Sequence, residues 1–360
     1  MENLVKPNPQ FWSSKSVLLT GHTGFKGGWL ASWLNQLGAN IRGFALAPDT
    51  NPNLFTQLGL GKMLGEDFHD LRDRNGIEQA LATSKPEIVF HLAAQPLVRQ
   101  SYSDPLETFA VNVMGTANLL EAVSRTSHVK AMVVVTTDKC YLNNESIWPY
   151  RENDPLGGRD PYSASKACTE IVTHSFRQSF LADRGIQVAT ARAGNVLGGG
   201  DWASDRLVPD CVRAAQKGET MVIRSPHATR PWQHVLEPLL GYILLAERLY
   251  AGPGPHFDAF NFGPPAHGVR PVSEVATAMM GLLGGKVELQ VQNSGLHEAT
   301  NLNLDSSKAR TLLGWRPRLT PDETLQWTAA WYRAIMEGKS SASTFTVQQI
   351  KDYQNKDRSV

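Results

Sequence analysis

A glycine-rich turn near the N-terminus constrains the fold of this chain more than any other feature. A short β-favouring run, Val17-Leu18-Leu19, leads directly into Gly21-His22-Thr23-Gly24-Phe25-Lys26-Gly27. Apolar residues then recur at helical spacing as far as Gly38, a suitable C-terminal cap. The pattern predicts a strand, a glycine turn and a helix, in which the backbone can approach a pyrophosphate at the helix N-terminus.

The spacing of these glycines leaves two interpretations of the loop open. It is G-x-x-G-x-x-G, one residue longer at the first gap than the common dinucleotide-binding fingerprint, and glycine clusters also occur in ordinary turns. The acid that binds the adenosine ribose is expected about 20 residues further on. Phe44-Ala45-Leu46-Ala47 occupies that place, with Asp49 slightly later, so the choice between NAD and NADP is not decided there.

Short apolar strands alternate with helical stretches through the first half of the chain. The strands are expected at 41–46, 88–92, 131–135 and 188–191, and the helices between them at 76–83, 105–123 and 161–181. Such alternation predicts an α/β fold with a parallel, doubly wound sheet of the Rossmann type.

The pattern changes after about Gly200, where loops rich in proline, glycine and arginine begin. We expect a Rossmann domain at 1–200 and a smaller, interleaved C-terminal substrate lobe formed by 201–234 and 264–338, with helices at 207–217, 272–283 and 321–336. The segment 235–263 is expected to return to the first domain as a helix and a strand. The polar tail 339–360 is compatible with either a mobile end or a short helix.

The composition excludes several classes of protein. Lys plus Arg number 35 and Asp plus Glu 34, so no global field attracts nucleic acid or anionic lipid. Cys140, Cys168 and Cys211 are too few and too widely spaced for a disulfide framework or a structural zinc site, and no metal is expected. The N-terminus lacks a signal-peptide core, and no stretch approaches the ~20 apolar residues of a membrane span. We therefore expect a cytoplasmic protein.

A tyrosine and a lysine stand one helical turn apart at the start of the helix expected at 161–181. Asp160 and Pro161 form a typical helix start, and they place Tyr162 and Lys166 on one helical face. Tyrosine has a reference pKa of about 10, which a neighbouring ammonium can lower towards the working range of a general base. The alternative is an exposed tyrosine beside a solvated lysine, and the glycine loop favours the catalytic interpretation.

Two further segments are candidates for cofactor contacts. Asp70-Leu71 is placed to meet the adenine, and Leu92-Ala93-Ala94-Gln95 follows a strand at the sheet edge where ligands bind. A solvated acid and a packing turn of small residues are the plain alternatives.

Together, the glycine loop and the Tyr162–Lys166 pair resemble the extended short-chain dehydrogenase/reductase family, from Val17 to about Trp315. The resemblance implies NAD as cofactor, with the tyrosine as base at a sugar hydroxyl and the lysine on the nicotinamide ribose.

The segment Thr136-Thr137-Asp138-Lys139 resembles the sugar-nucleotide 4,6-dehydratases of this family. Epimerases of the family usually carry small hydroxyl residues there. In a dehydratase, C4 oxidation acidifies the C5 hydrogen, and an acid, here Asp138 beside Thr137, protonates the departing C6 hydroxyl. Most dehydratases have a glutamate as the C5 base where this chain has Lys139. A lysine is a base only if its pKa is strongly depressed; otherwise it orients water or stabilises the developing enolate.

Four separated segments resemble the branch of these dehydratases that acts on CDP-glucose: the glycine loop, residues 92–99, Thr137-Asp138-Lys139 and residues 229–234. This implies CDP-D-glucose as substrate, CDP-4-dehydro-6-deoxy-D-glucose as product, tightly held NAD, and a role in deoxysugar synthesis for surface polysaccharide. An epimerase and a non-catalytic dinucleotide-sensing protein are the alternatives.

The same resemblance indicates how substrate and a second subunit are held. The family's asparagine near the diphosphate is matched by Asn195, and guanidinium groups, which can donate two parallel bonds to phosphate, are preferred as nucleotide anchors. The helices at 105–123 and 161–181 are expected to pair across a two-fold axis into a four-helix bundle, which makes a homodimer. The candidate substrate-binding residues are Asn195, Arg206, Arg224, Arg230 and His297.

Overall fold

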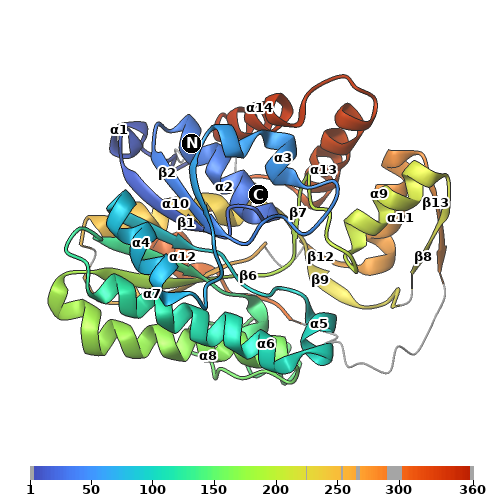
Figure 1. Cartoon of the computed structure of the whole chain (residues 1–360). Helices are drawn as coiled ribbons and strands as arrows, with labels where there is room; N and C mark the ends of the chain where they lie inside the picture. Colours follow the sequence, from blue (N-terminus) through green and yellow to red (C-terminus); the bar gives the residue numbers. More distant parts are fainter. Residues whose placement is uncertain (1–3, 224, 253, 265–267, 290–301, 357–360) are drawn as a thin grey trace.

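A seven-stranded parallel sheet forms the centre of the molecule in the computed structural model, which describes residues 4–223, 225–252, 254–264, 268–289 and 302–356 (Figure 1). The strand order is β11-β6-β5-β4-β1-β2-β3. The strands are β1 (Ser16–Thr20), β2 (Asn40–Ala45), β3 (Gly65–Phe68), β4 (Ile88–His91), β5 (Ala131–Val135), β6 (Gln187–Ala193) and β11 (Ala259–Phe262).

The central strands are buried on both faces, as their continuous apolar sequences require. Every residue of β4 and β5 is buried, and their register pairs Ile88 with Ala131 and His91 with Val134. The order reverses between β1 and β4, where the chain crosses from one half of the sheet to the other. The predicted doubly wound α/β fold is therefore confirmed, and ligands of such sheets bind at the carboxyl edge near this reversal.

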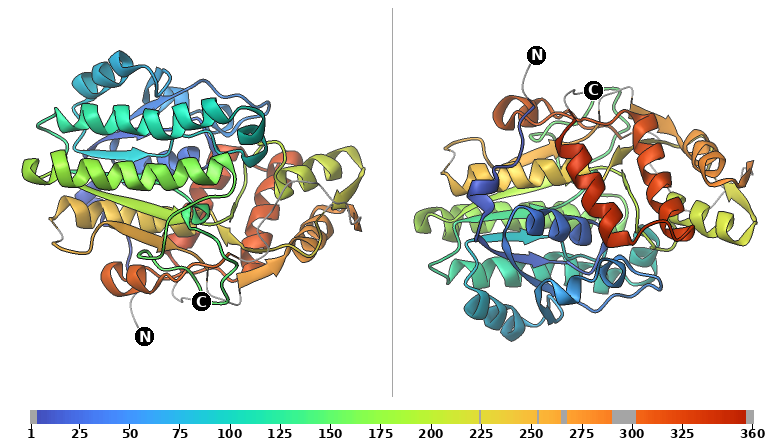
Figure 2. Two further views of the ribbon diagram at one scale, coloured as in Figure 1. Left: turned by 90° about the horizontal axis from the view of Figure 1, so that it is seen from below. Right: turned by 90° about the horizontal axis from the view of Figure 1, so that it is seen from above.

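One face of the sheet is covered by long helices that run side by side (Figure 2, left). Their apolar side chains pack on Leu18, Val89 and Val134 of the sheet. The two helices expected at 105–123 and 161–181 are present, each with a π-helical turn. The elements are α4 (Arg74–Ser84), α6 (Pro105–Phe109), η2 (Ala110–Met114), α7 (Gly115–Ser124), α8 (Pro161–Phe176) and η4 (Arg177–Leu181).

The other face carries the glycine-loop helix and the C-terminal helix. The segment after Lys339 forms a helix of 13 residues rather than a mobile end, and its Tyr353 ring meets Trp33 edge-on at 5.7 Å. Figure 2 (right) shows the last two helices, in red, over this side. The elements are α1 (Pro9–Trp12), α2 (Phe25–Gln36), α3 (Leu54–Leu58), η1 (Leu60–Lys62), α10 (Leu236–Tyr250), α12 (Ser307–Leu313) and α14 (Ala342–Gln354).

A second group of elements stands beside the carboxyl edge of the sheet, at the right of Figure 1. Helices α9 and α11 pack on each other and on a two-stranded sheet of β8 and β13. Three helices have the predicted bounds: α9 (Leu207–Lys217), α11 (Val272–Leu283) and α13 (Pro321–Met336). The strands are β7 (Val196–Leu197), β8 (Thr220–Ile223), β9 (Thr229–Pro231), β10 (Gln233–His234), β12 (Val269–Pro271) and β13 (Lys286–Leu289).

Three short elements complete the described chain: α5 (Val98–Ser103), η3 (Asp138–Cys140) and η5 (Ala182–Arg184). Within the described residues, no helix has both the length and the apolar character to cross a membrane. Cys140, Cys168 and Cys211 are free thiols.

Candidate active site

A cavity of about 1640 Å³ opens at the carboxyl edge of the sheet and is lined from both groups of elements. Pockets for a single small ligand usually measure about 300–1,000 Å³. The glycine loop, Tyr162, Met221 and Trp232 all contribute to its lining. The space therefore suits a dinucleotide and a second ligand that meet near Tyr162.

The glycine loop has the backbone geometry that a bound pyrophosphate requires. Gly21 has a φ of +79°, and a Cβ there would lie 2.6 Å from the backbone nitrogen of Ala93. Gly24 is the N-cap of α2, and no side chain caps the first turn of that helix. Its amides are therefore free to receive phosphate oxygens at the positive end of the helix. These residues fit NAD, and they remove the ambiguity of the glycine spacing.

Most of the predicted cofactor residues line this cavity. They are Gly21, Thr23, Gly24, Phe25, Lys26, Gly27, Asp70, Leu71, Leu92, Ala93, Ala94, Tyr162 and Lys166. Arg72 donates to the Asp70 carboxylate and lowers its pKa. Leu46 directly follows β2 and lines the cavity, and so does Asp49, the acid that comes slightly late in the sequence.

Two predicted cofactor residues lie elsewhere. The His22 ring is fully buried behind the loop against Phe55 and Phe68, and burial lowers its pKa to about 4. Gln95 donates to the Thr108 hydroxyl at 2.8 Å and shapes the turn after β4. Neither side chain lines the cavity among the described residues. Both side chains serve the packing of the loops around the cavity, and contact of these two residues with the cofactor stays a prediction.

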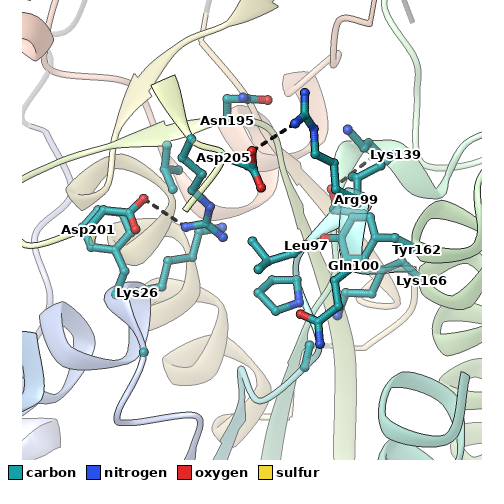
Figure 3. A pocket seen from close by; sticks show the side chains of 18 of the residues that line it. Lys26, Leu97, Arg99, Gln100, Lys139, Tyr162, Lys166, Asn195, Asp201 and Asp205 are labelled. Carbon is teal, nitrogen blue, oxygen red and sulfur yellow. Dashed lines mark hydrogen bonds and ion pairs between the residues drawn. The ribbon is translucent and has the colours of Figure 1, made fainter. Parts of the chain in front are cut away.

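Tyr162 and Lys166 lie in the first turns of α8 and face the cavity (Figure 3). The Asp160 carboxylate caps this helix by accepting from the Ser163 amide. The Lys166 ammonium donates to the Val135 carbonyl at 3.1 Å, and burial lowers its pKa to about 8. Burial raises the pKa of Tyr162 to about 12. In the protein chain by itself, burial therefore outweighs the groups that lower the pKa of Tyr162, and a lowering by Lys166 stays a prediction.

The end of β5 brings an acid next to this pair. Thr137 caps η3 and donates to the Asp138 carboxylate at 3.0 Å, and its side chain also acts to lower the pKa of Tyr162. Burial raises the pKa of Asp138, while the charges of Lys139 and Arg230 oppose that shift. Lys139 is partly buried and lines the same cavity. A carboxyl group that holds its proton at a raised pH is suited to general acid catalysis.

Lys26 lies nearer to the reacting groups than its place in the glycine loop indicates. Its pKa is lowered to about 8 by burial and by the charges of Arg206 and Lys166, against the pull of Asp138. Its ammonium is 3.5 Å from the Tyr242 hydroxyl. The cofactor loop and the catalytic groups thus share one electrostatic environment.

Three of the five predicted substrate residues line the cavity. Asn195, Arg206 and Arg230 face the same space as Asp138, as expected for groups that hold a nucleotide diphosphate. Arg206 donates to Asp201 at 2.9 Å, and this carboxylate raises the pKa of the guanidinium. Arg224 and His297 lie outside the described residues.

The sequence interpretation missed an ion pair between the two sides of the cavity. Arg99 on α5 and Asp205 in the loop before α9 point toward one another at 3.1 Å (Figure 3). Asp205 has a left-handed φ of 57°, which aspartate tolerates better than most residues. Arg99 lies in the segment 92–99 that carried the resemblance, but no periodic pattern marks Asp205.

The match to known proteins covers both the fold and the catalytic segments. A model of the NAD dependent epimerase/dehydratase family matches residues 17–263, from β1 to the end of the sheet. The chain belongs to this NAD dependent family, as its resemblance predicted. It is also 46% identical over 349 residues to the CDP-glucose 4,6-dehydratase of Salmonella typhimurium. This match covers 95% of this chain and 97% of the relative.

More distant relatives include both reaction types. The UDP-glucose 4-epimerase of Lacticaseibacillus casei is 27% identical over 282 residues, 75% of this chain and 83% of the epimerase. The dTDP-glucose 4,6-dehydratase of Bacillus anthracis in complex with NAD has a TM-score of 0.75 at 22% identity, covering 90% and 98% of the two chains. The structure of the UDP-glucose 4-epimerase of Thermus thermophilus in complex with NAD has a TM-score of 0.74 at 25% sequence identity. The match covers 88% of this chain and 98% of the epimerase chain. The fold is therefore shared by dehydratases and epimerases, and the site must discriminate between them.

Proposed function

We propose that this chain converts CDP-D-glucose into CDP-4-dehydro-6-deoxy-D-glucose and water, with NAD as a recycled cofactor. The observation that carries the proposal is the buried Asp138, which shares one cavity with Tyr162 and Lys166 and has a raised pKa. The 46% identity to a CDP-glucose 4,6-dehydratase supports the same reaction and the same nucleotide. An epimerase that acts at C4 needs no acid for a C6 hydroxyl.

The oxidation step uses the two residues of α8. The Tyr162 oxygen takes the proton of the C4 hydroxyl as the C4 hydrogen leaves as hydride. Lys166, buried on the same helical face, is placed to hold the nicotinamide ribose and to stabilise the phenolate by its charge. When bound, NAD supplies the hydride acceptor for C4 and the hydride donor for C6.

The elimination step uses the residues at the end of β5. The C4 ketone acidifies the C5 hydrogen, a base in the cavity takes the C5 proton, and the C6 hydroxyl leaves as water with the proton of Asp138. C6 then receives the hydride that was removed from C4, and C5 regains a proton. Thr137 is hydrogen-bonded to Asp138 and lines the same cavity as Tyr162, so it lies between the two reaction centres in this proposal. Lys139 lines the cavity beside them and supplies either the C5 base or a charge that stabilises the enolate. One water is lost and no external oxidant is consumed.

In this proposal the nucleotide is held by polar residues that line the cavity. Asn195 lies near the diphosphate, and Arg206 and Arg230 pair with its oxygens, since planar guanidinium groups suit phosphate. Arg224 and His297 are proposed members of the same set.

Incubation with CDP-glucose, UDP-glucose and dTDP-glucose tests the reaction directly. We expect an alkali-induced absorbance of a 4-keto sugar and the mass loss of one water with CDP-glucose. The variant Asp138→Asn should still oxidise C4 but eliminate water about 10²-fold more slowly, the lower range for a general acid, so reduced nicotinamide should accumulate. No turnover of CDP-glucose, or isomerisation at C4 without loss of mass, would contradict the proposal.

We further propose a homodimer formed through the helices α6 and α8. Leu106, Met114, Ile171 and Phe180 on this helical layer expose between 53% and 80% of their surface, although they are large apolar residues. Such a patch is typical of a protein–protein interface. Light scattering after size exclusion should give the mass of a dimer, and Ile171→Glu should shift it to a monomer. A monomer mass for the unmodified chain contradicts the bundle.

We propose a cytoplasmic role in the synthesis of deoxysugars for surface polysaccharide, such as the O-antigen of lipopolysaccharide. The three free thiols fit a reducing compartment. The proposed product, a 4-keto-6-deoxy sugar, is a common precursor for further deoxygenation and amination chemistry.

A further inference from the structure

A buried carboxylate lies beneath the catalytic groups and takes no part in the steps above. Glu170 follows Lys166 by one turn on α8 and is 4% exposed. Its two oxygens accept from the hydroxyls of Thr136 and Thr190, the latter at 2.6 Å, and from Arg192 at 2.8 Å. One carboxylate thereby joins α8 to the ends of β5 and β6.

The positions of these partners relate the carboxylate to both halves of the proposed reaction. Lys166 precedes Glu170 on the same helix, and Thr136, which directly follows β5, immediately precedes Thr137 and Asp138. We propose that Glu170 is a positioning residue that holds the oxidation pair of α8 in register with the elimination acid of β5. The inference rests on the proposed dehydratase function and deepens it.

Arg192 extends the same network behind the loop that carries Asp138. Its guanidinium donates to the Tyr141 hydroxyl at 2.8 Å and to the Glu152 carbonyl at 3.1 Å, and it lies 4.9 Å from the centre of the Tyr141 ring. The Tyr141 hydroxyl donates in turn to Asn261 at 2.7 Å. Because Tyr141 directly follows η3, the turn that contains Asp138 is fixed from its far end as well.

The charge of Glu170 also acts on Lys166. Burial lowers the pKa of Lys166, while the negative charge of Glu170 raises it and so favours the ammonium form. Three other titratable groups interact electrostatically with this lysine from neighbouring elements: Cys140 on η3, Lys26 on α2 and His91 on β4. Of these four groups, Glu170 is the one that forms an ion pair, at 2.8 Å with Arg192.

A contribution to stability alone does not account for this arrangement. A buried ion pair is often no more stable than apolar side chains of the same volume. The surrounding core is apolar, with Val134 and Val188 on the same strands and the same face of the sheet. An ion pair does, however, impose directional hydrogen bonds, which keep Thr136 and Lys166 at a constant separation.

Two variants separate positioning from stability. Glu170→Gln keeps an acceptor for one hydroxyl but removes the charge, and Thr136→Val removes only the link to β5. The control is Arg318→Met, because Arg318 is a buried arginine that donates to the backbone of Tyr353 and Val5, away from the cavity. Rapid mixing of NAD-loaded enzyme with CDP-glucose follows nicotinamide reduction and 4-keto product separately, across pH, with thermal unfolding measured in parallel.

We expect different signatures from the three variants. In Glu170→Gln, nicotinamide reduction should slow about 10- to 100-fold, and the limb of its pH profile that falls above about 8 should move to lower pH, because Lys166 loses its supporting charge. In Thr136→Val, reduction should be nearly normal while product formation lags about 10-fold. Arg318→Met should lower the unfolding temperature without either change.

The possible outcomes are distinct. If Glu170→Gln and Thr136→Val lose stability but keep the wild-type pH profile and the wild-type ratio of the two rates, Glu170 is structural and the inference is overturned. If Glu170→Gln does not fold, Thr136→Val alone decides by the same ratio. If the unmodified enzyme forms no 4-keto product from CDP-glucose, the proposed function fails, and the inference falls with it.

Discussion

Two buried carboxylates in this molecule have different partners. Glu170 pairs with the guanidinium of Arg192 and with two threonine hydroxyls, under the catalytic groups. Glu237 on α10 accepts from the backbone amides of Arg318 and Leu319 at 2.9 and 2.8 Å and from the Tyr353 hydroxyl at 2.6 Å. The second network joins α10 to the C-terminal helix, and its members do not line the described cavity.

The two networks differ in the charge of the groups that surround the carboxylate. Glu237 is satisfied mostly by neutral donors, and burial raises its pKa to about 7. A group of this kind makes stability sensitive to pH. Glu170 faces a full positive charge and an active-site lysine one turn away, so its effect should appear in the rate. The comparison predicts that substitutions around Glu170 alter catalysis and that substitutions around Glu237 alter unfolding.

The largest contrast should come from two matched tyrosines. Tyr162→Phe removes the proposed base and should lower kcat by about 10³-fold, within the range for general base catalysis. Tyr353→Phe removes the hydroxyl that donates to Glu237, so it should cost about 1–3 kcal/mol of stability and leave kcat near normal. Steady-state turnover and thermal unfolding of both variants check this. Near-normal turnover by Tyr162→Phe would remove it from the mechanism.

A smaller effect is expected in the pH dependence of stability. The folded-state pKa of Glu237, about 7, lies above its ordinary value of 4.5, so its contribution is complete below about pH 4.5 and is lost as pH rises through about 7. At roughly 1.4 kcal/mol per pH unit, the loss amounts to about 3 kcal/mol. Glu237→Gln should abolish it. Denaturant unfolding of both proteins from pH 4.5 to 8 measures the difference, and parallel curves would refute the assignment.

The parts of the fold and of the site that carry local sequence signals could be predicted from the sequence. The ends of α9, α11 and α13 match the predicted ranges because local signals, such as Gly218 and Gly284 after two of these helices, mark the boundaries. Tyr162 and Lys166 were visible because their spacing repeats a helical turn. The glycine loop was visible because the backbone there must approach both Ala93 and a phosphate.

Contacts between distant segments could not be predicted in this way. Glu170 meets Thr190 and Arg192 across about 20 residues, and Arg99 meets Asp205 across more than 100. Neither pair has a local pattern. The burial of the His22 ring was not predictable for the same reason: it depends on Phe55 and Phe68, which are brought to it by packing. The C-terminal helix was left open because its stability comes from contacts with α2 and α13 rather than from its own polar sequence.

The smallest predicted effect concerns the charge of Lys139 and its influence on the pKa of Asp138. Lys139 lowers the pKa of Asp138, so Lys139→Glu should raise that pKa further. Because the acid acts in its protonated form, the limb of the elimination profile that falls with rising pH should move to higher pH, with less than about a 10-fold change in the maximum rate.

Lys139→Met is the matched control, since it removes the charge without adding a base. If Lys139→Met abolishes elimination while Lys139→Glu retains it, Lys139 acts as the C5 base. If both variants eliminate water and only the pH limb moves, the lysine acts through its charge on Asp138 and on the developing enolate.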